Sequence, residues 1–178
     1  MDQAEPIFGH RGATLGLIGF GKIAQGVWQR FKALGFDKCL ISDPAISNEE
    51  AIAAGVLIAS HDEIFAQSDV LSLHCPLLAS THHVIDHQAL DAMKSSAYLI
   101  NVSRGGLINE DALAEALGEG RIAGAALDVF EHEPADTAHP LFKAPNTVLT
   151  DHVAWYSEQS VIALQTAAAR EVARVLSQ

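Results

Sequence analysis

The sequence predicts an α/β protein whose parallel β-sheet is doubly wound, with helices on both faces. Short runs rich in Val, Ile and Leu alternate with stretches of helical period, the pattern of βαβ units around a buried parallel sheet. Capping residues and glycines mark the ends of the helical stretches. Of the 178 residues, 49% are apolar, enough for one sizeable core. No repeat or linker is evident, so residues 1–178 are expected to form a single domain, with residues 1–12 as an N-terminal extension.

The first predicted strand, at residues 14–18, runs into a glycine-rich turn, and an amphipathic helix follows it. Gly35 is placed to end that helix, and a second strand at residues 39–42 comes next. Four apolar residues of the helix recur at helical spacing and are expected to face the sheet: Ile23, Val27, Phe31 and Leu34.

Two capping boxes predict short helices after the second and third strands. Ser47 pairs with Glu50 in the first box, and Ser60 pairs with Glu63 in the second. Gly55 is expected to end the first of these helices. The remaining strands are predicted at residues 56–58, 69–74, 97–101, 124–129 and 147–149, which completes the seven strands of a doubly wound sheet.

Two further helices are predicted in the second half of the chain. One spans Asn109 to about Gly118. The other is rich in Ala, runs from about Ser157 to Leu176, and needs a covering surface for its apolar stripe. That stripe consists of Val161, Leu164, Ala168, Val172 and Val175.

Charge and composition exclude several classes of protein. The 22 acidic and 11 basic residues give a net charge of −11, which argues against nucleic acid as a partner. The two cysteines, Cys39 and Cys75, match no metal or disulfide spacing, so a reducing compartment, the cytoplasm, is expected. No long apolar run and no signal-peptide pattern is present, so neither a membrane association nor export is expected.

A glycine-rich motif between the first strand and the first helix predicts a dinucleotide site. Gly19 permits a tight turn, Gly21 lets a pyrophosphate approach the backbone, and Ala24 allows close packing of helix on strand. The free N–H groups at the start of the helix favour the anion. Together with the strand and helix on either side, the motif favours a Rossmann-type nucleotide site over a turn without a ligand. A flavin or an adenosyl ligand remains an alternative.

Asp43 predicts which dinucleotide is preferred. It follows the second strand, close to the position about 20 residues after the turn at which an acidic residue accepts the ribose hydroxyls. Its carboxylate would repel a 2′-phosphate, and no arginine stands directly beside it in the sequence. The expected cofactor is therefore NAD, in preference to NADP.

Several longer segments resemble one family throughout, from about residue 12 to the end. They are TLGLIGFGKIAQ, SDP, SLHCPLLAST, MKSSAYLINVSRGGLI, GAALDVFEHEP and HVAWYSEQS, in this order along the chain. These segments resemble the motifs of the NAD-binding domain of the D-isomer-specific 2-hydroxyacid dehydrogenases. The last of them is most similar to the branch of the C-terminal-binding proteins, although Asp151 stands where the family usually has proline.

The resemblance implies an NAD-dependent oxidoreductase that transfers hydride between NAD(H) and a 2-hydroxy or 2-keto acid. By this resemblance Arg104, Glu133 and His152 are the catalytic residues. The guanidinium of Arg104 would hold the substrate carboxylate, His152 would exchange a proton with the substrate oxygen, and Glu133 would orient the imidazole. Taken without its motif, Arg104 would be interpreted equally well as a loop arginine paired with a surface acid. His152 and Glu133 alone would be interpreted as a structural or exposed histidine and a surface glutamate.

The resemblance also assigns residues to the cofactor and the substrate. Arg104 and Trp155 are expected to bind substrate, and Asp128 to contact the nicotinamide carboxamide. Family members usually pair through this domain, which implies a homodimer. The expected cofactor-binding residues are Gly19, Gly21, Lys22, Ile23, Asp43, His74, Cys75, Pro76, Thr81, Val102, Ser103, Asp128 and His152.

Two other functions compete with a complete dehydrogenase. Family members have a substrate domain before the glycine turn, where this chain has about a dozen residues, so we expect an isolated NAD-binding domain with little activity. A non-catalytic NAD(H)-binding sensor or corepressor-like module is one alternative, and a domain used only for oligomerisation is another. NAD binding without turnover would favour the sensor, and no NAD affinity would favour the oligomerisation domain.

Three histidines, His82, His83 and His87, lie close together in the sequence, with Asp86 among them. Hydride transfer needs no metal, and these residues match no recognised pattern of metal ligands. No metal site is therefore expected.

Overall fold

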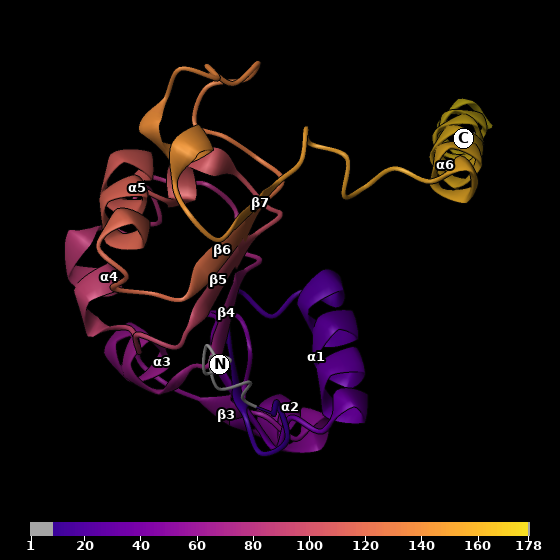
Figure 1. Cartoon of the computed structure of the whole chain (residues 1–178). Coiled ribbons are helices and arrows are strands. Elements are labelled where there is room, and N and C mark those ends of the chain that lie inside the picture. The colour runs from indigo at the N-terminus through magenta and orange to yellow at the C-terminus, as the bar shows by residue number, and fades with distance from the viewer. Residues whose placement is uncertain (1–8, 178) are drawn as a thin grey trace.

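The computed structural model of the chain describes residues 9–177 and contains one seven-stranded sheet (Figure 1). All neighbouring strands are parallel, in the order β3-β2-β1-β4-β5-β6-β7, which confirms the predicted doubly wound sheet. The order reverses beside β1, so the crevice between the ends of β1 and β4 is the expected ligand position. The strands are β1 (Thr14–Ile18), β2 (Lys38–Ser42), β3 (Leu57–Ile58), β4 (Val70–Leu73), β5 (Tyr98–Asn101), β6 (Gly124–Leu127) and β7 (Thr147–Leu149).

Helices cover both faces of the sheet. One apolar cluster joins β1 and β2 to α1 and α2, and a second joins the central strands to α3, α4 and α5. Figure 1 shows α1 on one side of the sheet and α3, α4 and α5 on the other. The helices are α1 (Lys22–Leu34), α2 (Asn48–Ala54), α3 (His61–Gln67), α4 (His87–Ala92), α5 (Glu110–Gly118) and α6 (Glu158–Leu176), with short 3₁₀ helices η1 (Gly105–Leu107) and η2 (Pro140–Lys143).

The helix ends that were predicted from capping residues and glycines are confirmed for α1, α2 and α3. Both capping boxes form, with the Ser47 hydroxyl accepting from the amide of Glu50 and the Ser60 hydroxyl from that of Glu63. Gly35 ends α1 in the left-handed conformation, at φ 101°. The predicted strands at residues 69–74 and 124–129 are shorter in the structure, because their last residues already belong to the loops that form the site.

The predicted buried face of α1 is confirmed for Val27 and Phe31, which are partly buried against the core, and is wrong for the other two residues. Ile23 and Leu34 are 72% and 58% exposed, and the buried residues are Ala24 and Trp28. The helix starts directly after the glycine turn, which sets its rotation so that these two residues meet the sheet. The indole N–H of Trp28 donates to the carbonyl of Ala54 at 3.1 Å and so ties α1 to α2.

Two helices differ from the sequence-based expectation in other ways. Helix α4 was not predicted, and the side chain of Asp86 caps it by accepting from the amide of Ala89. Helix α6 forms as predicted, but none of its residues is buried, and it lies apart from the sheet at the end of an extended segment (Figure 1). No helix in the described part of the chain is both long enough and apolar enough to span a bilayer.

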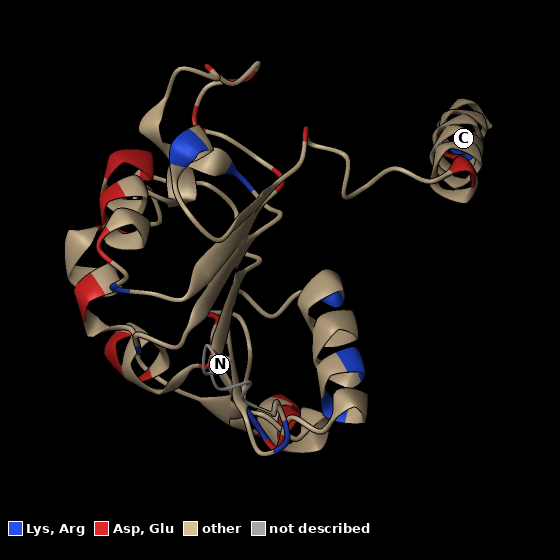
Figure 2. Cartoon of the chain, viewed as in Figure 1, with Lys and Arg blue, Asp and Glu red and all other residues tan. Residues whose placement is uncertain are grey.

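Charged residues are distributed unevenly over the helices. Figure 2 shows Asp and Glu mostly along α2 and the outer surfaces of α3, α4 and α5, and Lys and Arg along α1. The acidic residues of α2 lie on the same side of the sheet as α1, and those of α3, α4 and α5 lie on the other side.

Candidate active site

The glycine turn opens a space over the N-terminus of α1. Gly19 has φ 90°, and a Cβ on it would lie 2.6 Å from the carbonyl carbon of His74, so only glycine allows the turn to lie against the loop after β4. Gly21 caps α1 without a side-chain hydrogen bond, and nothing lies within 4 Å of the position of its missing Cβ. Free backbone N–H groups and open space at this point suit a phosphate group.

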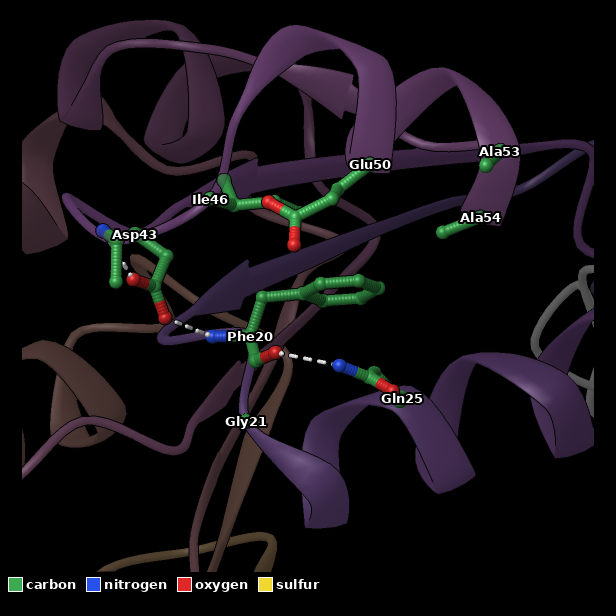
Figure 3. Close-up of a pocket in the computed structure, with 9 residues that line it drawn as sticks. Phe20, Gly21, Gln25, Asp43, Ile46, Glu50, Ala53 and Ala54 are labelled. Atoms are coloured by element: carbon green, nitrogen blue, oxygen red, sulfur yellow. Dashed lines mark hydrogen bonds between the residues drawn. The ribbon is translucent and has the colours of Figure 1, made fainter.

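Two hollows meet at Gly21. The first, of about 520 Å³, lies between α1 and α2 and includes Asp43 and Gln25 (Figure 3). The second, of about 460 Å³, includes His74. Two compartments joined at a phosphate-binding turn match the two nucleotides of NAD, joined by their pyrophosphate, so the described residues fit this cofactor. The second hollow also contains four other predicted cofactor residues, Lys22, Ile23, Val102 and Ser103.

Asp43 is held at the edge of the first hollow. One carboxylate oxygen accepts from the amide of Phe20 at 2.7 Å, and the other accepts from the amide of Ala45 at 2.8 Å (Figure 3). Each oxygen keeps a further acceptor site for a ribose hydroxyl. Among the described residues that line this hollow none is Lys or Arg, while Glu50 adds a second carboxylate.

The loop after β4 forms one wall of the second hollow. Burial lowers the pKa of His74, and its Nε2 lies 2.9 Å from the hydroxyl of Ser72. Cys75 is buried, and its carbonyl accepts from the hydroxyl of Ser103. The hydroxyl of Thr81 donates to the carbonyl of Pro76 at 2.7 Å, which closes the loop rather than leaving this hydroxyl free to donate to a ligand.

His152 and Glu133 form a hydrogen-bonded pair. Nδ1 of His152 lies 2.8 Å from a carboxylate oxygen of Glu133. Because a carboxylate only accepts, Nδ1 carries the proton and Nε2 is left for another partner. The hydrogen bond from His152 holds the pKa of Glu133 below its usual value. Burial opposes this shift, whereas the hydrogen bond from the amide of Phe130 and the charge of Arg104 add to it.

Asp128 holds the segment that contains His152. Its carboxylate accepts from the hydroxyl of Thr150 at 2.6 Å and from the amides of Val153 and Ala154 at 2.8 and 2.9 Å. The carbonyl of Asp128 accepts from the amide of His152, whose φ is 49°. Burial raises the pKa of Asp128, but the hydrogen bonds outweigh it, so the pKa is lowered. Neither this role of Asp128 nor the contribution of Thr150 was predictable from a local motif.

Arg104 lies on the loop after β5, which packs against the loop after β6. A side chain on Gly105 would overlap the backbone of Phe130, so glycine is required for the two loops to approach. Arg104 is exposed, and its guanidinium donates to the carbonyl of Ser103. The amide side chain of Asn101 bridges this loop by donating to the carbonyl of Arg104. Arg104, Glu133 and His152 thus come from the loops after β5, β6 and β7.

In the described part of the chain, the side chains of three other predicted or considered residues make no hydrogen bond or ion pair with Arg104, Glu133 or His152. Trp155 is 55% exposed and packs edge-to-face on Tyr156, with a ring separation of 5.6 Å. Asp151, which replaces the usual proline, is exposed. His87 lies near Glu115, at 3.8 Å, and does not join His82 and His83.

Comparison with known proteins identifies a single family. The profile described as D-isomer specific 2-hydroxyacid dehydrogenase, NAD binding domain, matches residues 1–154. A D-3-phosphoglycerate dehydrogenase from Methanocaldococcus jannaschii is 42% identical over 166 residues, which is 93% of this chain and 31% of that protein. A glyoxylate reductase from Thermofilum pendens is 37% identical over 93% of this chain and 49% of its own length.

Solved structures agree with the sequence relatives. The structure of D-lactate dehydrogenase from Escherichia coli has a TM-score of 0.85 at 32% identity, over 96% of this chain and 53% of that one. The NAD complex of a D-isomer specific 2-hydroxyacid dehydrogenase from Lactobacillus delbrueckii has a TM-score of 0.78 at 34% identity, over 92% of this chain and 55% of that one. The chain therefore spans between about a third and about half of the length of these relatives.

Proposed function

This chain belongs to the D-isomer specific 2-hydroxyacid dehydrogenase family as its NAD-binding domain, and from that membership we propose that the natural protein that contains it transfers hydride between NAD(H) and a 2-hydroxy or 2-keto acid. The observation that supports this activity most directly is the hydrogen bond of 2.8 Å between His152 and Glu133. The pair lies at the carboxyl ends of the strands, where the loop of Arg104 also lies.

The three proposed catalytic residues divide the work between binding and proton transfer. Bound NAD(H) would supply or accept the hydride. The planar guanidinium of Arg104 holds the substrate carboxylate through two parallel hydrogen bonds and polarises the neighbouring carbonyl. Nε2 of His152 donates a proton to the carbonyl oxygen during reduction and removes it from the hydroxyl during oxidation. Glu133 accepts the hydrogen bond from Nδ1 and so fixes the tautomer and the orientation of the His152 imidazole.

The remaining site residues are proposed to surround the nicotinamide and the substrate. His74, Cys75, Pro76 and Asp128 border the nicotinamide in this proposal, which is supported by the position of His74 in the second hollow. The exposed ring of Trp155, three residues after His152, is proposed to contact the apolar part of the substrate.

Substitution of the proton donor tests the proposal in the longest natural protein that contains this chain. His152→Asn is expected to reduce turnover by about a hundredfold or more while NADH affinity stays nearly unchanged. Arg104→Ala is expected to raise KM for the keto acid as well. His87→Gln, a histidine outside the cluster, is the matched control and should leave both constants unchanged. Normal turnover of His152→Asn across the pH range would contradict the assignment of the proton donor.

A non-catalytic NAD(H)-binding module is the second candidate. The solvent-exposed pair of Trp155 and Tyr156 beside His152 supports it, because exposed aromatic residues are common at protein interfaces. Tight NADH binding with no turnover of glyoxylate, pyruvate or hydroxypyruvate by the longest natural protein would favour this candidate over the dehydrogenase.

We also propose a cytoplasmic homodimer. The unburied apolar side chains of α6, among them Leu164 and Val172, support a second copy as a covering surface. Both cysteines are unpaired in the structure, which suits a reducing compartment. Neither nucleic acid nor a membrane is proposed as a partner. Sedimentation that gives only a monomer at micromolar concentration would contradict the dimer.

A further inference from the structure

Two histidines and a glutamate meet at the surface between the loop after β4 and the loop after β6. Nε2 of His83 lies 2.8 Å from a carboxylate oxygen of Glu131, and Nε2 of His82 lies 3.8 Å from the same oxygen. The two imidazole rings stack with their centroids 3.8 Å apart. One nitrogen from each histidine and one carboxylate oxygen all lie within 4.8 Å of one another.

The backbone of each of these residues is fixed by a hydrogen bond. Side chains on a fixed backbone lose little freedom when they bind a ligand, which favours binding. The amide of His82 donates to the carbonyl of Leu78 at 2.8 Å, and the amide of His83 donates to the carbonyl of Gly106 at 2.9 Å. The amide of Glu131 donates to the carboxylate of Glu110 at 2.6 Å.

The carboxylate of Glu131 has no competing cation nearby. Within the described residues no Lys or Arg lies within ion-pair distance of it, and its partners are the two imidazoles. The side chain of Glu110 adds a second negative charge next to its backbone. Figure 2 shows further acidic residues along α5, so the local potential favours a cation.

We propose that His82, His83 and Glu131 bind one divalent transition-metal ion of the Zn²⁺ class. Two imidazoles and a carboxylate form a donor set that suits Zn²⁺, Co²⁺ and Ni²⁺, whereas Mg²⁺ and Ca²⁺ prefer oxygen ligands alone. The side chains of His82, His83 and Glu131 are 53%, 28% and 31% exposed, which leaves room for water to complete the coordination. The metal replaces the direct hydrogen bond between His83 and Glu131.

The sequence places His82 and His83 side by side but did not indicate the third ligand, because it is distant along the chain. Glu131 is 48 residues from His83. The neighbours that looked like ligands have other partners: Asp86 caps α4 and His87 lies near Glu115. A metal here would join the loop that contains Cys75 to the loop that contains Glu133, two residues after Glu131.

Titration of the untagged 178-residue chain with ZnCl₂ tests the proposal directly. We expect one saturable site in the micromolar range by calorimetry, a rise in the unfolding temperature with Zn²⁺, and no comparable effect of MgCl₂. Co²⁺ provides a second probe, because its visible absorption reports the nitrogen and oxygen ligands. Absence of saturable binding of both Zn²⁺ and Co²⁺ would overturn the proposal.

Single substitutions locate the site. His82→Gln, His83→Asn and Glu131→Gln are each expected to weaken Zn²⁺ binding by at least about tenfold. Asparagine is chosen at position 83 because it tolerates the left-handed backbone there, with φ 50°. Because the side chain of His82 is 53% exposed, His82→Gln tests the site even if another variant folds poorly.

Two control variants distinguish this site from other histidines. His87→Gln changes a histidine four residues from His83, and His152→Asn changes the other histidine that is hydrogen bonded to a glutamate. Both are expected to bind Zn²⁺ as the unmodified chain does. Loss of binding in either control, or unchanged binding in Glu131→Gln, would place the metal elsewhere and overturn the proposal.

Discussion

At the level of a single side chain, we expect Asp43 to set the preference between NAD(H) and NADP(H). Its carboxylate is fixed by two backbone amides, and the hollow beside it has a second acid and no described basic residue. The unmodified chain is therefore expected to bind NADH well above NADPH, because the 2′-phosphate would meet negative charge. Asp43→Ser should reduce the ratio of the NADH affinity to the NADPH affinity by at least about tenfold, mainly because NADPH binds more tightly. Equal affinities of the unmodified chain for both cofactors, measured by calorimetry, would contradict this.

Some residues of the site were predictable because their signal lies in a local motif. Gly19, Gly21 and Asp43 take the positions that the glycine pattern predicts, and His152 and Glu133 pair as the family resemblance implies. The structural role of Asp128 was not predictable, because its three hydrogen bonds come from a segment more than twenty residues away in the sequence. Contacts of this range depend on the register of the sheet.

At the scale of elements, Gly105 determines how closely the loop after β5 approaches the loop after β6. The missing side chain lets the loop after β5 contact the backbone of Phe130. Gly105→Ala is expected to lower the free energy of unfolding by about 2 kcal/mol or more, because the backbones must separate. Urea denaturation measures this change.

Gly118→Ala is the matched control for that substitution. Gly118 is the last residue of α5, and nothing lies within 4 Å of the position of its missing Cβ. Alanine there should leave the free energy of unfolding unchanged or raise it by up to about 1 kcal/mol. If both alanine variants had the same stability, close loop contact at Gly105 would not be the cause.

Asp69 joins three elements and makes stability depend on pH. Its carboxylate accepts from the amide of Thr14 and from Lys94, both at 2.7 Å. Partial burial raises the pKa of Asp69, but the bonds from Lys94 and Thr14 outweigh it, so the folded-state pKa lies below that of the unfolded chain. The stabilisation is therefore present above about pH 4 and is lost as the pH falls through the folded-state value.

Asp69→Asn is expected to test that dependence. The variant should be less stable than the unmodified chain at neutral pH by about 1 kcal/mol, because both groups are partly exposed to solvent. The difference should shrink as the pH is lowered from about 5 to about 2. Urea denaturation across this range measures it, and a difference that grows with acidity would contradict the assignment.

Helix ends were predicted more accurately than helix faces. A capping box such as that of Ser60 and Glu63 is formed by residues three apart, so the sequence determines it. Which face of α1 is buried depends on how the helix is docked on β1 after the glycine turn. Ile23 and Leu34 were predicted to be buried from their spacing, but both are exposed. Helix α4 was not predicted because its 6 residues are too few to show a helical period of apolar residues.

At the scale of the whole molecule, the chain is expected to bind the cofactor without catalysing turnover of a substrate. Both hollows are formed by this chain, but the side chains of His152 and Glu133 are 42% and 39% exposed. A site this open neither excludes water nor fixes a small substrate, and loss of positioning alone removes several orders of magnitude in rate.

The 178-residue chain is therefore expected to bind NADH but to oxidise it negligibly with pyruvate, glyoxylate or hydroxypyruvate. NADH fluorescence measures the binding, and its absorbance over hours measures the oxidation. Robust turnover by the purified chain would contradict this expectation, and would mean that a second copy completes the site.

The order of the strands also implies an order of events during folding. β1 pairs with β2 across a connection that contains only α1, with Thr14 opposite Lys38, 38 − 14 = 24 positions away, whereas its pairing with β4 brings Thr14 to Asp69, 55 positions away. Closing the longer loop costs more entropy, so that pairing is expected to form later. The first hollow uses residues 20–54 only, and the second extends to residue 103. A refolding chain would thus acquire a place for an adenosine before it acquires a place for a nicotinamide.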